Sequence, residues 1–171
     1  WTADFSAFAA DALTIRDHNT AELVPLEFNR GQQIMHAITE KQKAEAGHVR
    51  QLLLKTRRFG GSTYIEGRFY WRTALNPNRS TFITGHEEAS PSTLDARAKL
   101  RHEQCALAPE TRKSNAQELI FDTPEGKGLK SQYKLATARN ADAGKSQGVH
   151  YLHLSEEAMY QGGGHDLLSG L

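Results

Sequence analysis

The most informative stretch of this chain is Leu52-Leu53-Leu54-Lys55-Thr56-Arg57-Arg58-Phe59-Gly60-Gly61-Ser62-Thr63. The three leucines predict a buried strand, and the glycine pair with the hydroxyls after it predicts a turn into a helix. A phosphate-binding loop has this order of elements and reads G-x-x-x-x-G-K-[ST]. Gly60 takes its second glycine position and Ser62 its hydroxyl position, whereas Lys55 replaces the first glycine and Gly61 the lysine. The lysine is therefore moved to the front of the loop rather than lost.

The chemistry of phosphate binding requires three kinds of group, and this loop can supply each of them. A glycine-containing turn at a helix N-terminus directs backbone N–H groups at an anion. Lys55, Arg57 and Arg58 are candidate cations for the phosphates, and the hydroxyl of Ser62 or Thr63 can bind Mg²⁺. The alternative is a β-hairpin or strand–helix turn with exposed basic residues, because glycine-rich turns are common.

A second feature lies near the end of the chain, where an apolar run from Val149 to Leu154 is followed by acidic residues. In phosphate-loop NTPases a strand of this kind carries a carboxylate that orients the attacking water. The usual pair is Asp-Glu; here Ser155 stands first, so Glu156 must supply the carboxylate. The alternative is a strand followed by the acidic first turn of a helix, with Ser155 as its N-cap.

Taken in order, these segments resemble the large terminase subunit of tailed bacteriophages, the motor that packages DNA into procapsids. The similarity runs from about residue 1 to residue 160. It rests on five segments: Pro25–Gln32, Lys55–Thr63, Leu135–Asn140, Gly148–His150 and Leu152–Ala158. The chain departs from the family at Arg58, where many members carry Gln, and at Gly61, where others have a larger residue.

The resemblance implies a role for each residue of the site. Lys55 and Arg58 would contact the phosphates of ATP, and Glu156 would orient the attacking water. Gln32 would read the adenine base, and Arg57 would stabilise charge during hydrolysis. The remaining residues of the loop would form the phosphate cradle, with Ser62 as the ligand of Mg²⁺: Gly60, Gly61, Ser62 and Thr63.

The resemblance also implies cofactors and partners. ATP and Mg²⁺ would be the cofactors, and double-stranded DNA would be moved by hydrolysis. The portal protein, the small terminase subunit and sister subunits in a homo-oligomeric ring on the procapsid would be the partners, in the host cytoplasm. Because nothing corresponds to the family's coupling motif or nuclease domain, we expect residues 1–171 to be an ATPase-domain fragment without the nuclease domain.

Composition sets limits on these expectations. A length of 171 residues suits one domain, and a net charge of +1 gives no overall basic field for nucleic acid. The single cysteine, Cys105, cannot form an internal disulfide, which fits a reducing compartment. No run approaches the roughly 20 apolar residues of a membrane span, so we expect no membrane partner.

Hydrophobic periodicity and turn residues predict the elements. Helices are expected at residues 4–15, 32–45, 63–75 and from 91 to about 107. Strands are expected at 49–54, 80–84, 118–121, 130–138 and 149–154. This alternation predicts an α/β fold like that of phosphate-loop NTPases, with a mainly parallel central sheet flanked by helices. The C-terminal ends of such strands share one edge, which would bring Lys55 and Glu156 together.

Two other functions fit part of the pattern. One is a helicase-like ATPase of the same loop class, and the other is a non-catalytic remnant that binds nucleotide or DNA. A zinc site is disfavoured because His150 and His153 lie three apart on a strand and point to opposite faces. A hydrolase triad is disfavoured because no G-x-S-x-G turn surrounds Ser155.

Overall fold

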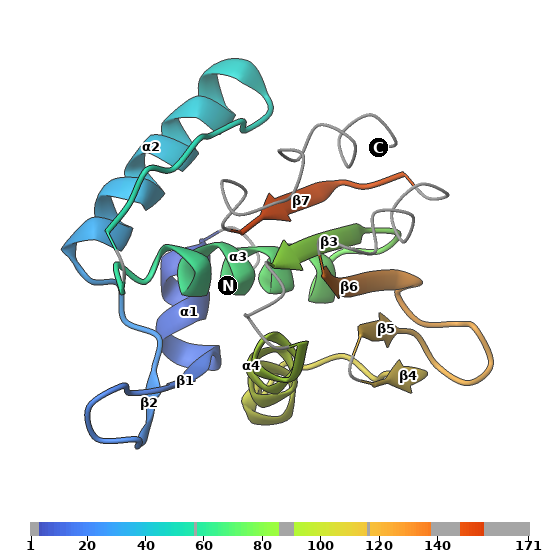
Figure 1. Cartoon of the computed structure of the whole chain (residues 1–171). Helices are drawn as coiled ribbons and strands as arrows, with labels where there is room; N and C mark the ends of the chain where they lie inside the picture. Colours follow the sequence, from blue (N-terminus) through green and yellow to red (C-terminus); the bar gives the residue numbers. More distant parts are fainter. Residues whose placement is uncertain (1–3, 57, 86–90, 116, 138–147, 156–171) are drawn as a thin grey trace.

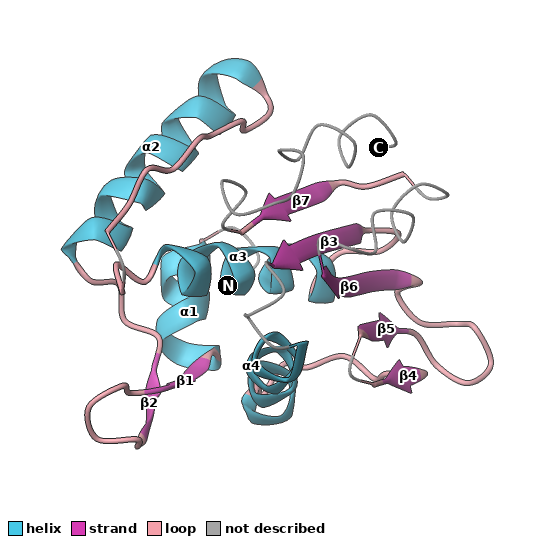
Figure 2. Cartoon of the chain, in the orientation of Figure 1, coloured by secondary structure: helices cyan, strands magenta, loops and turns pink. Residues whose placement is uncertain are grey.

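The computed structural model describes residues 4–56, 58–85, 91–115, 117–137 and 148–155. Its helices are α1 (Phe5–Ala12), α2 (Arg30–Ala46), α3 (Gly61–Ala74) and α4 (Pro91–Gln104). Its strands are β1 (Thr14–Arg16), β2 (Leu23–Pro25), β3 (Ser80–Gly85), β4 (Lys113–Ser114), β5 (Glu118–Phe121), β6 (Ser131–Thr137) and β7 (Tyr151–Leu154). Figures 1 and 2 show the helices grouped around one side of the sheet that contains β3.

The main sheet is mixed, which corrects the expected mainly parallel, phosphate-loop NTPase-like sheet. Five strands lie in the order β4-β5-β6-β3-β7, and β1 with β2 forms a separate antiparallel pair. The pairs β3–β6 and β3–β7 are parallel, whereas β4–β5 and β5–β6 are antiparallel. The prediction of the sheet type from alternating elements was therefore wrong for the half of the sheet formed by β4, β5 and β6.

The physical reason lies in the connection between β5 and β6. Residues 122–130 join the two strands, and a parallel crossover needs about a dozen residues or more. A turn at Gly126 (φ +72°) folds the chain back, with Gly126 N–H donating to the Thr123 carbonyl at 2.9 Å. Asp122 closes the loop by accepting from the N–H of Gly128 at 2.7 Å. The two strands consequently pair as a hairpin.

The predicted strand at residues 49–54 is also wrong. No strand is assigned there, and the Leu52 and Leu54 side chains are 93% and 99% exposed. The segment runs back along α2 instead, where the Gln42 side chain bonds to both the N–H and the carbonyl of Arg50. Of the three leucines only Leu53 packs against the core. An apolar run makes a strand only where a neighbouring strand accepts its hydrogen bonds, and here none does among the described residues.

The other predicted helices and strands agree better with the observed residue ranges. Helices α2, α3 and α4 lie at the predicted sites, with ends shifted by up to three residues. The first predicted helix is shorter, because α1 ends at Ala12 and the chain then enters β1. Strands β3, β5, β6 and β7 overlap the strands expected at residues 80–84, 118–121, 130–138 and 149–154.

Helix α3 crosses one face of the sheet in the direction opposite to the parallel strands. Near its C-terminal end, the Thr73 hydroxyl bonds to the hydroxyl of Thr81 at the start of β3, at 2.6 Å. One turn earlier, the Phe69 ring packs on Tyr151 at the start of β7, with centroids 5.5 Å apart. The N-terminus of α3 therefore points to the edge where β3 and β7 end.

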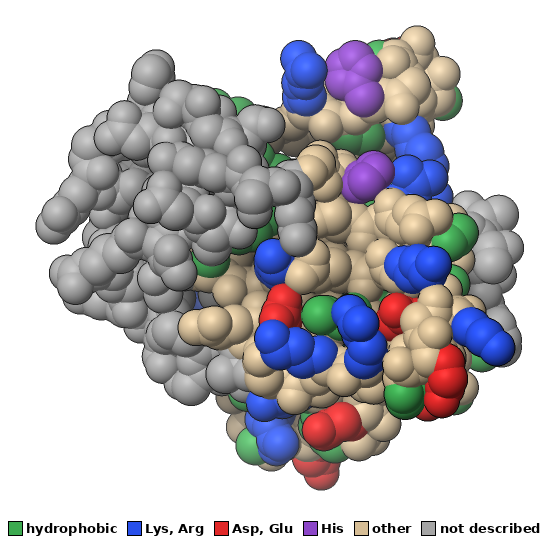
Figure 3. Space-filling model, turned by 90° about the vertical axis from the view of Figure 1, so that its right-hand side faces the viewer, with side chains coloured by type: hydrophobic (Ala, Val, Ile, Leu, Met, Phe, Trp, Pro, Cys, Tyr) green, Lys and Arg blue, Asp and Glu red, His purple; other side chains and the backbone are tan. Residues whose placement is uncertain are grey.

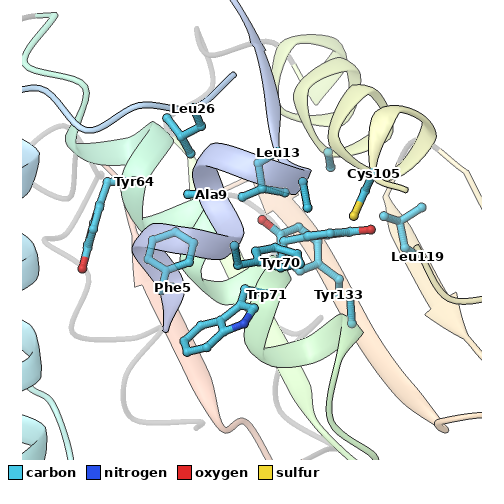
Figure 4. Packing of buried hydrophobic residues seen from close by; sticks show 14 of the residues in the cluster. Phe5, Ala9, Leu13, Leu26, Tyr64, Tyr70, Trp71, Cys105, Leu119 and Tyr133 are labelled. Carbon is cyan, nitrogen blue, oxygen red and sulfur yellow. The ribbon is translucent and has the colours of Figure 1, made fainter. Parts of the chain in front are cut away.

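The core lies between α3, α1 and this face of the sheet. Figure 4 shows Phe5 beside Trp71, whose rings stack with centroids 5.4 Å apart. Gly67 lets α3 approach α1 and β2 closely, because a Cβ there would lie 3.2 Å from Leu13 and 3.3 Å from Leu26. Each fully buried aromatic ring of this kind stabilises the fold by about 1.5–3 kcal/mol.

Helix α2 lies at the edge of the molecule (Figure 1) and is held to α3 by polar contacts. His36 Nδ1 lies 3.0 Å from the Tyr64 hydroxyl, and Arg68 forms an ion pair with Glu40 at 2.6 Å. Ile34 and Ile38 of α2 are each 54% exposed. Among the described residues, no helix is both long and apolar enough to cross a membrane.

Candidate functional site

The N-terminus of α3 presents free backbone donors. Gly60, the N-cap residue, has φ +82° and provides no side-chain cap. Its carbonyl accepts from Tyr64 N–H at 3.1 Å, but no group among the described residues accepts from the N–H groups of Gly61, Ser62 or Thr63. Three free N–H groups at the positive end of a helix dipole are an arrangement that binds anions. The first turn of α3 can therefore accept an anion, but the strand that the phosphate-loop pattern places before it is absent from residues 49–54, and phosphate binding stays a prediction.

Lys55 lies across this first turn. A Cβ built on Gly61 would meet Leu53 Cδ2 at 2.8 Å and Lys55 Cδ at 3.1 Å. The Lys55 stem therefore occupies the space above Gly61, at the position where the standard loop carries its lysine. Any residue larger than glycine at position 61 would displace that stem. Glycine at position 61 consequently leaves the room that the Lys55 stem occupies.

Two side chains at the start of α2 form hydrogen bonds to backbone carbonyls of the loop. Asn29 and Gln32 form a reciprocal capping box. Gln32 Nε2 also donates to the Gly60 carbonyl at 2.9 Å, and Asn29 Nδ2 donates to the Phe59 carbonyl at 3.3 Å. Gln32 is only 4% exposed, and its Oε1 accepts from the Asn29 N–H. Adenine recognition by Gln32 stays a prediction, whereas its contact with the loop is part of the structure.

Phe59 anchors the middle of the loop. Its ring lies directly over Gly31 of α2, where a built Cβ would come within 2.2 Å of the ring carbon Cε2. Another ring carbon, Cδ1, lies 3.3 Å from a Cβ built on Gly61. The aromatic ring therefore fills the space between two glycines, one on each helix, and fixes the distance from α2 to the N-terminus of α3.

Arg58 has a left-handed backbone conformation, with φ +64°, which residues other than glycine rarely adopt. This left-handed region costs a non-glycine residue roughly 1–2 kcal/mol. We expect Arg58→Gly to be more stable than Arg58→Ala by about 1 kcal/mol, after allowance for the greater freedom of glycine in the unfolded chain. Urea denaturation measures the difference. Both variants lack the guanidinium, so equal stabilities would show that the backbone at position 58 is unstrained.

The ends of β3 and β7 lie at the same edge as this loop. Ser155 N–H donates to the Thr84 carbonyl at 2.9 Å, which continues the parallel pairing by one residue. The two predicted catalytic residues, Arg57 and Glu156, lie outside the described residues. The structure therefore brings together Gln32, Lys55, Gly60 and Gly61. Ser62 and Thr63 lie on the same first turn of α3, Arg58 lies two residues before Gly60, and the strand β7 leads to Glu156.

A buried ion-pair cluster lies one turn behind the loop. Glu66 of α3 is 1% exposed and pairs with Arg101 of α4 through Oε2 at 2.7 Å. Arg97 approaches the other oxygen, Oε1, at 3.5 Å without the geometry of a hydrogen bond. Tyr133 of β6 donates its hydroxyl to the Glu66 carbonyl at 3.1 Å, and burial raises the pKa of this tyrosine. The cluster fixes the first half of α3 to α4 and the sheet.

On the face drawn in Figure 3, Asp and Glu side chains lie among the Lys and Arg side chains of the lower part, whereas the upper part shows Lys, Arg and His side chains. The described residues of this face therefore do not form a single basic field. Within the described part of the chain, no three His, Cys, Asp or Glu side chains come together as a metal site. A magnesium ion bound with a nucleotide needs few protein ligands; Ser62, the predicted ligand, lies at the second position of α3, and its role stays a prediction.

Sequence reasoning missed some of the residues that shape the loop. Asn29 and Gly31 were not singled out, although both contact loop residues. A signal for the first was present, because Asn29 followed three residues later by Gln32 is a capping-box spacing. No local signal marks Gly31, since its partner Phe59 lies 28 positions further along the chain.

Comparisons with known proteins add no assignment. No model of a protein family matches the chain, and a search of curated proteins finds no match.

Proposed function

We propose that this chain binds ATP with Mg²⁺ through the loop Lys55–Thr63 and hydrolyses it. The observation that carries the proposal is the first turn of α3, where the N–H groups of Gly61, Ser62 and Thr63 have no acceptor among the described residues and lie beside the Lys55 stem. Phosphate groups are bound by this combination of backbone donors and a flexible cation. The loop and the strand that leads to Glu156 also reach the same edge of the sheet.

Each residue has a defined role in this proposal. The N–H groups of Gly61, Ser62 and Thr63 bind phosphate oxygens, and Lys55 and Arg58 neutralise their charge. Bound Mg²⁺ would stabilise charge on the phosphates, and Ser62 would hold it. Glu156 orients the attacking water and Arg57 stabilises the charge that develops. Gln32 fixes the loop through the Gly60 carbonyl and reads adenine.

The wider function that we propose is that of a DNA-packaging motor. It rests on the ordered resemblance to the large terminase subunit of tailed bacteriophages. On this proposal the chain is the ATPase part of that subunit and acts in the host cytoplasm. It works as one member of a ring on the procapsid, with double-stranded DNA, the portal protein and the small terminase subunit as partners.

A second candidate is a non-catalytic remnant, which binds nucleotide but does not hydrolyse it. Ser155 supports it, because the usual Asp before the catalytic glutamate is replaced by a hydroxyl. The two candidates differ in a single property, since both predict binding and only the first predicts hydrolysis.

Phosphate release from ATP separates these candidates. We expect release by the purified chain to require Mg²⁺ and to respond to added double-stranded DNA. Heat-denatured protein is the control for contaminating hydrolysis. Binding of Mg²⁺-ATP without release would favour the remnant, and the absence of both would refute the nucleotide site.

A further inference from the structure

Most of the exposed large hydrophobic side chains lie on one arm of the molecule, formed by α2 and residues 47–54. Six such side chains are exposed in the described part of the chain, and five of them belong to this α2 arm. They are Ile34, Ile38, Val49, Leu52 and Leu54. Single exposed hydrophobic side chains are normal on a protein surface, whereas a group of them marks an interaction site. The α2 arm lies at the edge of the molecule (Figure 1), where a partner can reach it.

The two isoleucines belong to a stripe of exposed residues along α2. At 3.6 residues per turn, the members of this stripe fall within about 80° of one another around the helix axis. They are Arg30, Ile34, Ile38, Lys41 and Glu45, and all five are exposed. The buried residues of α2 lie outside the stripe, so the stripe faces solvent.

The segment after α2 adds a second apolar row beside the stripe. Because the Gln42 side chain bonds to both the N–H and the carbonyl of Arg50, the chain runs back along the helix from that level. An extended chain advances about 3.3 Å per residue, against about 1.5 Å in a helix. Counted from this contact, Leu52 and Leu54 reach about the levels of the two isoleucines. Leu53 packs against the core, so the leucines on either side of it point away from the core.

The charges of the stripe are self-complementary in one orientation. Arg30 begins α2 and Glu45 lies near its end, about 22 Å away along the axis, so they cannot pair within one copy. If two copies pack antiparallel about a two-fold axis between positions 37 and 38, Arg30 of each copy lies opposite Glu45 of the other. Lys41 then lies opposite Ile34, which its aliphatic stem can cover while the ammonium group stays in water. A parallel pair would set like charges against one another at both ends.

We propose that the α2 arm is an interface between two copies of this chain, which pack antiparallel through the stripe and the leucines beside it. Each copy contributes the same apolar side chains to the centre of the interface: Ile34, Ile38, Leu52 and Leu54. The ion pairs of Arg30 with Glu45 close both ends. Charge complementarity therefore selects a second copy of the chain as the occupant of this face.

The size and symmetry of the contact define the expected assembly. A helix of 17 residues is about 25 Å long, so the face suits a small interface and a reversible dimer rather than a permanent one. The same surface is used by both copies, and such a contact closes at two copies. It is therefore separate from the contacts of a ring, and the proposal does not depend on the nucleotide site.

The first test measures the mass of the full chain by sedimentation equilibrium across the micromolar range. We expect the parent to pass from monomer to dimer as its concentration rises. Ile38→Lys places two like charges beside the two-fold axis and should weaken the dimer at least about tenfold, as a change at the centre of an interface does. The matched control is Leu23→Lys, which makes a similar change at an exposed hydrophobic residue outside the α2 arm and should leave association unchanged.

The second test exchanges the charges at the ends of the stripe. Arg30→Glu and Glu45→Arg each set like charges opposite one another, so each should weaken the dimer several-fold. The double variant restores opposite charges in the antiparallel pair only and should associate like the parent. Unfolding cannot imitate such a recovery. A double variant that associates no better than the single variants would contradict the antiparallel arrangement.

The remaining outcomes are equally decisive. A parent that stays monomeric throughout the micromolar range would overturn the proposal and leave the α2 arm to a different protein. Assemblies of three or more copies, or a dimer that Ile38→Lys does not weaken, would also refute it, because the contact would then lie on another surface. Urea denaturation of each variant verifies that the fold is intact.

Discussion

Replacing Glu66 by glutamine is expected to lower the free energy of unfolding by about 3–5 kcal/mol, the usual cost of removing one partner of a buried ion pair. Glu66 and Arg101 are both almost fully buried, and their 2.7 Å contact joins α3 to α4. Glutamine keeps the size of the side chain but leaves the Arg101 charge uncompensated. Because a domain of this size is stable by about 5–15 kcal/mol, urea denaturation measures the loss directly.

Two control variants separate the charge from other effects. Leucine at 66 combined with methionine at 101 removes both charges, so much of the stability should return. Lys41→Ala disrupts the exposed pair of Lys41 with Glu45 and should change stability by less than about 1 kcal/mol. If Glu66→Gln is as stable as the parent, the buried cluster does not support the orientation of α3.

Glu156→Gln is expected to lower the rate of ATP hydrolysis by about 100-fold or more, the usual contribution of a positioned general base. Glutamine has nearly the same shape but does not take a proton from water. The affinity for Mg²⁺-ATP should change little, because the loop and not Glu156 holds the phosphates. Phosphate release and calorimetry on the same preparations measure the two properties.

The neighbouring residue provides a matched control. Glu157→Gln makes the same chemical change one position further along and should leave the hydrolysis rate within about threefold of the parent, since only one carboxylate is assigned to the water. Full turnover by Glu156→Gln would show that the glutamate assignment is wrong. A large loss of the hydrolysis rate in Glu157→Gln alone would assign the catalytic role to Glu157 instead of Glu156.

Local features of the sequence predicted most of the helices and strands. Asn29 and Gln32 begin α2, the glycine pair at 60 and 61 begins α3, and Pro91 begins α4. Each of these signals acts within a few residues, so the sequence alone reveals it. Gly60 takes positive φ without strain because it is glycine, whereas the positive φ of Arg58 in the same loop had no local signal in the sequence.

Features that depend on distant partners were not predictable. The Leu52–Leu54 run matches a buried strand in composition, yet no neighbouring strand pairs with it in the described part of the chain. The antiparallel direction of β5 and β6, by contrast, follows from the short connection at 122–130, a local signal that outweighs the alternation of elements. Contacts such as Gly31 with Phe59 and Glu66 with Arg101 join residues about thirty positions apart and leave no periodic signal.

The central claim is that the loop at the N-terminus of α3 binds nucleotide phosphates with Lys55 as its cation. Calorimetric titration of Mg²⁺-ATP into the parent, Lys55→Ala and Lys41→Ala tests it most directly. We predict binding by the parent and by Lys41→Ala, and an affinity at least about tenfold lower in Lys55→Ala, as expected for the loss of a charged hydrogen bond. Binding by Lys55→Ala as tight as that of the parent would contradict the account.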